Sequence, residues 1–140
     1  MIGLSAEPLD PVMLVEAVRL DAYGAIVTFL GTTRETSPGD PRPVEALEYE
    51  AYPAMALPTM EAIATEAHDR FGPLAIAMVH RTGRVALGEP SVAVVVAAPH
   101  RGTAFDACRF AIDALKARVP VWKREVYRDG GAAWIANAPP

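Results

Sequence analysis

The sequence predicts an α+β fold: one mixed domain over residues 1–140, with a mainly antiparallel sheet packed by helices and a C-terminal hairpin. Three observations support this prediction. A length of 140 residues suits one domain. Stretches with helical spacing and short apolar runs follow one another in mixed order, which is typical of α+β or mixed α/β domains. Two short apolar runs near the C-terminus flank Asp129-Gly130-Gly131, which is typical of a hairpin turn.

The expected elements of the first half begin with a helix. Asp10 and Pro11 suit the N-cap and the first helical position, and valines then recur at helical spacing until about Leu20. Three more elements follow: a mostly apolar strand over 25–30, a half-buried strand over 44–51 after a polar loop, and a helix from about Met55 to Phe71. Pro58 is expected in the first turn of that helix, where proline is tolerated.

The second half predicts two apolar strands, a long helix and the hairpin. The strands are expected over 74–80 and 91–98, with a turn over 85–90 between them. The helix is expected to begin at Thr103, with Asp106 completing a variant capping box, and to end before Pro120. Its inner face is predicted to hold Phe105, Cys108, Ile112 and Leu115. The hairpin is expected to pair 122–127 with 133–135.

Composition excludes several classes of protein. The net charge of −4 argues against general nucleic-acid binding. Cys108 is the only cysteine, so no disulfide can form within the chain, which fits a reducing compartment. The N-terminus lacks the pattern of a secretory signal, and no apolar stretch reaches the roughly 20 residues of a membrane span. We therefore expect a soluble cytoplasmic protein that binds neither nucleic acid nor membrane.

The basic residues are unevenly distributed. Between His100 and Arg128, seven Lys/Arg stand against three Asp/Glu, so this segment carries +4 and the rest of the chain −8. Such a segment suggests a local anion site, and a solvated helix face explains it equally well. Only two of the 13 basic residues are lysines, Lys116 and Lys123, and both lie here. Because a buried lysine can lose its proton whereas arginine does not, these two are candidate acid–base residues.

Sequence motifs for common cofactor sites are absent. The chain has no Gly-rich dinucleotide or P-loop motif, and no Cys-x-x-Cys or His-Glu-x-x-His zinc pattern. We therefore expect neither a metal ion nor an organic cofactor. Cys108 is expected to be inert in the core, as buried cysteines usually are. His80 ends an apolar strand and is expected to be a hydrogen-bonded structural histidine, and His68 an exposed helix residue.

Three further cationic side chains are candidates for anion binding. His100 and Arg101 precede the longest helix, and a helix N-terminus attracts phosphate or carboxylate. A solvated loop in which Arg101 pairs with a glutamate is an equal alternative. Arg34 lies in a loop just beyond a buried strand, a place where sites often form, and an ordinary surface arginine is its alternative.

Five stretches of this sequence form a pattern that spans about Ala25 to Trp134. They are GAIVTFLG at 24–31 with Arg34 following, LEYEAYPAM at 47–55, VHRTG at 79–83, PHR at 99–101 leading to Ala104-Phe105, and LKARVPVWKRE at 115–125. The last is the most specific. In their order and spacing the chain resembles the large, catalytic subunit family of molybdopterin synthase.

The resemblance implies a sulfurtransferase that converts cyclic pyranopterin monophosphate to molybdopterin in molybdenum-cofactor synthesis. It implies that sulfur arrives as a thiocarboxylate on the Gly-Gly C-terminus of a small ubiquitin-like partner subunit. It also implies a homodimer of large subunits within a heterotetramer, without metal or organic cofactor. The family's essential lysines fall on Lys116 and Lys123. Its pterin-phosphate contacts fall on Thr32, Thr33, Arg34, His100, Arg101, Lys116, Lys123, Arg124 and Glu125.

Helix geometry adds an expectation about how this site is assembled. Thr103 and Lys116 are 13 positions apart on the predicted helix, about 20 Å at 1.5 Å per residue. His100 and Arg101 therefore cannot easily share a compact site with Lys116 of the same chain. We expect a composite site, with His100 and Arg101 from one large subunit and Lys116 and Lys123 from its dimer partner.

One departure from the family and two rival functions accompany this reading. Some members carry a further arginine shortly after the final tryptophan, whereas Trp134 here is followed by Ile135, Ala136, Asn137 and Ala138. The first rival is a non-catalytic module that binds a ubiquitin-like tail. The second is a lysine-dependent lyase or phosphate-ester hydrolase that uses the same cationic pocket.

Overall fold

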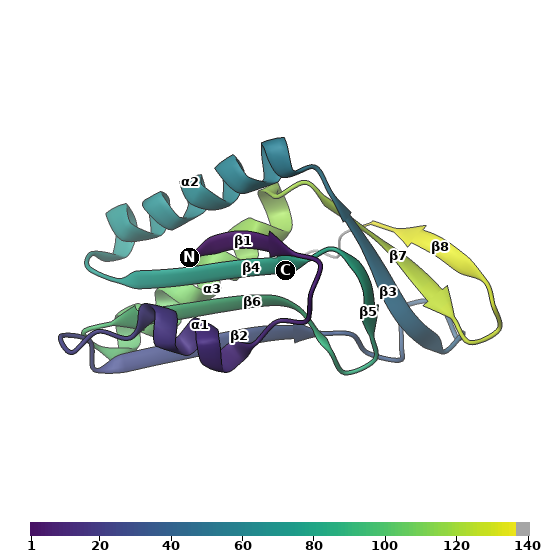
Figure 1. Ribbon diagram of the computed structural model, residues 1–140, viewed down its shortest axis with the longest axis horizontal. Helices are drawn as coiled ribbons and strands as arrows, with labels where there is room; N and C mark the ends of the chain where they lie inside the picture. Colours follow the sequence, from purple (N-terminus) through teal and green to yellow (C-terminus); the bar gives the residue numbers. More distant parts are fainter. Residues whose placement is uncertain (137–140) are drawn as a thin grey trace.

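Two four-stranded sheets and three helices make up the part of the chain that the computed structural model describes, residues 1–136 (Figure 1). The first sheet has the order β1-β4-β6-β2 and the second β5-β3-β7-β8. Among the strands of residues 1–136, only β1 and β4 pair in parallel. In chain order the elements are β1 (Ile2–Ser5), α1 (Pro11–Val18), β2 (Ala25–Thr32), β3 (Val44–Ala51), α2 (Pro53–Phe71), β4 (Ala75–Arg81), β5 (Gly83–Ala86), β6 (Pro90–Ala98), α3 (Arg101–Arg118), β7 (Val121–Tyr127) and β8 (Ala132–Ile135). The predicted α+β class is confirmed, with two sheets where one was expected.

The central strand β6 of the first sheet is buried on both faces, which explains its unbroken apolar run. Val92, Val94 and Val96 of that strand join the core beneath α2 and α3. Ala93 and Val95 point the other way and pack with α1. Because successive side chains of a strand point to opposite faces, a strand covered on both sides reads as continuously apolar. Figure 1 shows α1 on one side of this sheet and α2 and α3 on the other.

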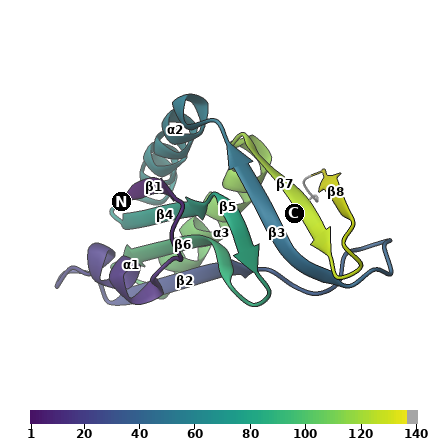
Figure 2. The ribbon, with the colours of Figure 1, turned by 45° about the vertical axis from the view of Figure 1, so that its right-hand side comes forward.

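The second sheet stands at one end of the first (Figures 1 and 2). Its two central strands, β3 and β7, pair antiparallel, with Tyr49 opposite Lys123. β7 turns into β8 at Asp129 and Gly130, where Gly130 adopts a φ of 93° that favours glycine. The predicted C-terminal hairpin is therefore confirmed. This sheet matters for function because β7 carries three of the candidate residues.

The predicted start and inner face of the long helix are partly wrong. α3 begins at Arg101, with His100 as an N-cap that makes no side-chain cap bond, so Thr103 lies inside the helix. Phe105 is 61% exposed instead of buried. The buried face consists mainly of alanines, together with Cys108 and Leu115 as predicted. Small side chains let α3 lie close to the sheet, and a pattern of large apolar residues does not reveal such a face.

Three smaller differences also have physical explanations. α2 begins at Pro53, so Pro58 lies inside the helix instead of in its first turn. β1 was not predicted because it has only four residues, all half-buried, and pairs with a distant part of the chain. β5 occupies Gly83–Ala86, where a turn was expected to begin. Only Val85 of β5 is buried, so this edge strand has little apolar pattern.

Candidate functional site

The only two lysines of the chain are brought together by the sharp connection between α3 and β7. Lys116 lies in the last turn of α3, and Lys123 is the third residue of β7. Pro120 ends the helix because the residue before a proline is disfavoured in the helical conformation. The chain then turns back at once, since β7 begins at Val121. Both lysines therefore face the same pocket.

This hollow, which we call the lysine pocket, has a volume of about 250 Å³. Its walls come from the end of β2, the loop after it, β3, β6, α3 and the β7–β8 hairpin. Five of the predicted site residues line it: Thr32, Arg34, Lys116, Lys123 and Glu125. A pocket with three cations and one carboxylate, all near a strand-end loop, is suited to an anionic ligand.

Burial makes Lys116 chemically distinct from an ordinary surface lysine. Removal from water lowers the pKa of Lys116, and the positive charge of Lys123 lowers it further. The ion pairs within residues 1–136 all involve arginine, so neither lysine is neutralised by a carboxylate. A lowered pKa makes Lys116 a better proton acceptor than an ordinary lysine at the same pH, and Lys123 can stabilise negative charge.

Glu125 is held in one orientation at the edge of the lysine pocket. Its side chain is 6% exposed, and its Oε1 accepts a hydrogen bond of 3.0 Å from the hydroxyl of Tyr127. Lys123 and Glu125 are two residues apart on β7, so strand alternation places them on the same face. Glu125 is therefore a fixed acceptor beside Lys123.

Four predicted site residues do not line the lysine pocket. Arg124 alternates to the opposite face of β7, where it forms an ion pair with Glu48 and lies 5.9 Å from the Trp134 ring. Thr33 is 3% exposed, and its backbone bonds to Glu89 and Gly88. The remaining two are His100 and Arg101, which are exposed at the far end of α3 from Lys116.

Three residues that sequence reasoning did not place in the site surround the lysines. Tyr49 lines the lysine pocket, and its hydroxyl donates to Ser91 Oγ at 3.1 Å. Ser91 in turn donates to the carbonyl of Gly31 at 3.2 Å. His80 lies behind Tyr49, with ring centroids 4.8 Å apart. The alternation of β3 could have indicated Tyr49, whereas nothing in the sequence pairs His80 with the lysines.

The described part of the chain offers no alternative centre for metal or thiol chemistry. Residues 1–136 contain no cluster of three or more metal-ligating side chains. Cys108 is buried, and burial raises the pKa of its thiol to about 11, so almost none is thiolate at neutral pH. This supports the expected inert role of Cys108. Within the same residues no helix is long and apolar enough to cross a membrane.

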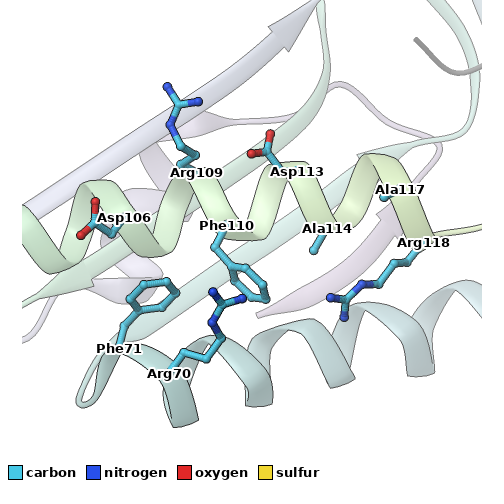
Figure 3. A pocket seen from close by; sticks show the side chains of 9 residues that line it. All are labelled: Arg70, Phe71, Asp106, Arg109, Phe110, Asp113, Ala114, Ala117 and Arg118. Carbon is cyan, nitrogen blue, oxygen red and sulfur yellow. The ribbon is translucent and has the colours of Figure 1, made fainter. Parts of the chain in front are cut away.

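A second, wider hollow lies between α2 and α3 and contains no lysine. This helix groove has a volume of about 510 Å³ and is lined by Arg70, Phe71, Asp106, Arg109, Phe110, Asp113, Ala114, Ala117 and Arg118. Figure 3 shows Arg70 beside the ring of Phe110. The distance from Arg70 Cζ to the centroid of that ring is 4.5 Å. Arg118 is paired with Glu66 at 2.6 Å. Two of the groove's three arginines therefore already have partners.

Comparison with known proteins shows which family this chain resembles. Residues 4–118 match the model of the family described as MoaE protein. A "Molybdopterin synthase catalytic subunit" of Emericella nidulans is 42% identical over 97% of this chain and 69% of its own. A solved molybdopterin synthase from Staphylococcus aureus has a TM-score of 0.88 and 32% identity, covering 94% of each chain.

A third comparison concerns the fold alone. A complex of subunits 1 and 2 of molybdopterin-converting factor from Helicobacter pylori contains a chain with a TM-score of 0.79 and 21% identity, covering 99% of this chain and 92% of that one. The family match covers well over half of the chain, and the curated relative exceeds 40% identity. The chain therefore belongs to the MoaE protein family.

Proposed function

We propose that this chain is the catalytic subunit of a molybdopterin synthase. The reaction is transfer of sulfur to cyclic pyranopterin monophosphate, which gives molybdopterin. The sulfur comes from the thiocarboxylated C-terminus of a small ubiquitin-like partner subunit. The observation that supports this most strongly is the lysine pocket, where the chain's only two lysines meet Arg34 and Glu125 without being neutralised. The names of the relatives, which call them catalytic subunits, support the same reaction.

The chemistry explains why this pocket holds uncompensated cations. The phosphate and the thiocarboxylate are both anions, and negative charge develops as sulfur attacks. Arg34 is placed to bind an anion at the mouth of the pocket, and Lys123 to stabilise the developing charge. Lys116 takes or returns the proton, because its lowered pKa brings it closer to neutral pH. Cys108 donates no sulfur, and the reaction needs no metal or organic cofactor.

The two remaining cations belong, in our proposal, to a site shared between two large subunits. Arg101 and Lys116 are 15 positions apart on α3, about 22 Å along the helix. His100 and Arg101 would therefore complete the pocket of a dimer partner, within a heterotetramer. Phe105 supports such an interface, because it is a large apolar side chain 61% exposed one turn from Arg101. The single cysteine supports a cytoplasmic location.

The shared site can be tested by mixing two inactive variants. Arg101→Ala and Lys116→Ala subunits are expected to regain activity in mixed dimers, because one of the two pockets then has every cation. Mass spectrometry of the intact complex would verify subunit exchange. Mixed dimers as inactive as their parents would show that the four cations do not act across the interface.

The proposed reaction is tested by a sulfur-transfer assay. Purified chain, a thiocarboxylated small subunit and cyclic pyranopterin monophosphate should yield molybdopterin, and Lys116→Ala should lose at least about 100-fold in rate. His68→Ala is a suitable control because His68 is exposed on α2, away from the pocket. A stable complex with the small subunit that gives no product would favour the non-catalytic module instead.

A further inference from the structure

A much smaller cavity lies behind the lysine pocket. This inner cavity has a volume of about 10 Å³. His80 of β4, Lys116 of α3 and Lys123 of β7 line it, and Tyr49 and apolar side chains complete the wall. A space of this size holds about one water molecule, provided that two to four polar groups are present to bind it. His80 and the two lysines meet that condition.

Backbone geometry fixes the proton of His80 on one ring nitrogen. Nδ1 lies 2.7 Å from the carbonyl oxygen of Arg81. A carbonyl oxygen only accepts, so Nδ1 must donate, and Nε2 of the neutral ring carries a lone pair. The residue is only 2% exposed, and its ring lines the inner cavity. The lone pair of Nε2 is therefore available to a donor inside that cavity.

The ring of His80 is also held from its other side. Tyr49 contacts it edge to face, with an angle of 70° between the rings. Tyr49 is itself held through Ser91 to the backbone of Gly31. Two independent hydrogen-bonded anchors therefore keep the imidazole in one orientation, as positioning of a neighbouring group requires.

The electrostatic surroundings leave His80 neutral. Burial lowers its pKa to about 4, and the charges of Lys116 and Lys123 act in the same direction. The nearest other charge on β4, the Arg81 guanidinium, is bound to Glu89 at 2.8 Å. The neighbours of His80 on β6 and β1 are the apolar Val92 and Leu4. No carboxylate among residues 1–136 lines the inner cavity, so its side-chain acceptors are His80 Nε2 and the Tyr49 hydroxyl.

We propose that His80 is a positioning residue for Lys116, acting through one water that donates to Nε2 of His80 and accepts from the lysine ammonium. Lys116 needs such a partner because it is partly buried and forms no ion pair within residues 1–136. The bound water holds Nζ in place and partly replaces the solvation that burial removes. His80 itself transfers no proton. The catalytic consequence rests on the proposed function, whereas the hydrogen-bond arrangement does not.

Nuclear magnetic resonance tests the arrangement without any activity. In a long-range ¹H–¹⁵N spectrum of the complete chain, His80 is expected as the neutral Nδ1–H tautomer at pH 7 and to stay neutral down to about pH 5, since its pKa is about 4. The exposed His68 and His100 serve as internal references. An Nε2–H tautomer, or a charged ring at pH 6, would overturn the proposal.

The lysines provide the second readout, and the chain contains only two to assign. In His80→Phe the acceptor is lost, so the ammonium of Lys116 is less stabilised and its titration midpoint should move to lower pH than in the wild type. His80→Gln keeps an acceptor and should move the midpoint back. The control is His68→Phe, which exchanges an exposed histidine and should leave it unchanged. An unchanged midpoint in folded His80→Phe would rule out the proposed contact.

Kinetics then connect the contact to catalysis. His80→Phe should lower kcat for sulfur transfer about tenfold with little change in KM, because the misplaced group is used after substrate binds. The acidic limb of the kcat profile should move to lower pH, and His80→Gln should recover most of the rate. Equal kcat and KM in wild type and His80→Phe would contradict a positioning role. A wild type that makes no molybdopterin would instead reject the proposed function and leave the spectroscopic result standing.

Discussion

Two hollows of this molecule, the helix groove and the lysine pocket, contain cations that differ in their interaction partners. In the helix groove, Arg118 is paired with Glu66, and Arg70 covers the ring of Phe110 (Figure 3). In the lysine pocket, Lys116 and Lys123 have no such partners within residues 1–136. The groove has about twice the volume of the pocket. Size therefore does not single out a candidate anion site. The partners of the cations distinguish the two hollows, because in the groove only Arg109 lacks an ion pair or ring contact among residues 1–136.

The difference between the two hollows is tested most directly by removing one cation from each and comparing the rates of sulfur transfer. Lys123→Ala should lower the rate of sulfur transfer by at least about 100-fold, because no other side chain takes over its charge in the transition state. Arg70→Ala should leave the rate within about twofold, since Arg70 contacts only the Phe71 and Phe110 rings and Glu66, away from the lysine pocket. The sulfur-transfer assay measures both. Equal losses in the two variants would show that the groove also takes part in the reaction.

A second test asks whether burial gives Lys116 its special role. Because the pKa of Lys116 is lowered, the neutral amine becomes available as pH rises through that value, and the rate should rise with it. Lys116→Arg keeps the charge but holds its proton at every accessible pH. The rising limb should therefore disappear, with a loss of about 100-fold at its upper end. A pH–rate profile with the same shape as the wild type would argue against proton transfer at this position.

Lys116 and Lys123 also show how much of the candidate site could be predicted from the sequence. The pair of lysines stands out because the chain has no others, and the apolar runs and Pro120 predicted α3 and β7, which bring them together. The strand order of the second sheet was harder to predict, because β3 and β7 are some 75 residues apart in the sequence and pair only in the folded chain. His80 illustrates the limit. The position of His80 at the end of an apolar strand predicted its burial correctly, but its place in the inner cavity depends on three distant elements, β3, α3 and β7.

The assignments of Thr33 and Arg124 illustrate a different limit, that of resemblance. Neighbouring positions in a strand face opposite sides, so a motif that includes Lys123 and Glu125 also takes in Arg124, which pairs with Glu48. Thr33 is likewise buried beside Thr32, which lines the pocket. The tail after Trp134 adds Ile135 and Ala136 to the pocket lining, whereas Asn137 and Ala138 lie outside the described residues.

A third and smaller effect is expected at the mouth of the lysine pocket. Arg34 is exposed there, so its attraction for a phosphate is screened by salt. Arg34→Ala should raise the KM for the pterin phosphate about tenfold at low ionic strength and leave kcat nearly unchanged, because Arg34 acts mainly in binding. The effect should shrink as salt is added. A large fall in kcat with unaltered KM would instead place Arg34 at the reacting atoms.

The smallest effect is expected from the paired cations of the helix groove, and it concerns stability alone. Arg118 lowers the pKa of Glu66, so this pair stabilises the folded chain above the unfolded pKa of Glu66 and loses that contribution as pH falls through the folded value. Arg118→Gln should therefore lower Tm slightly at pH 7 and by less at pH 2, because protonation of Glu66 removes the pair as pH falls. Because both side chains are exposed, the shift in Tm should be a few degrees at most.

Thermal unfolding at the two pH values measures this shift, with Arg109→Gln as the control for loss of a groove arginine. A larger shift at pH 2 than at pH 7 would mean that Arg118 stabilises the helices through packing against Phe110 instead of through Glu66.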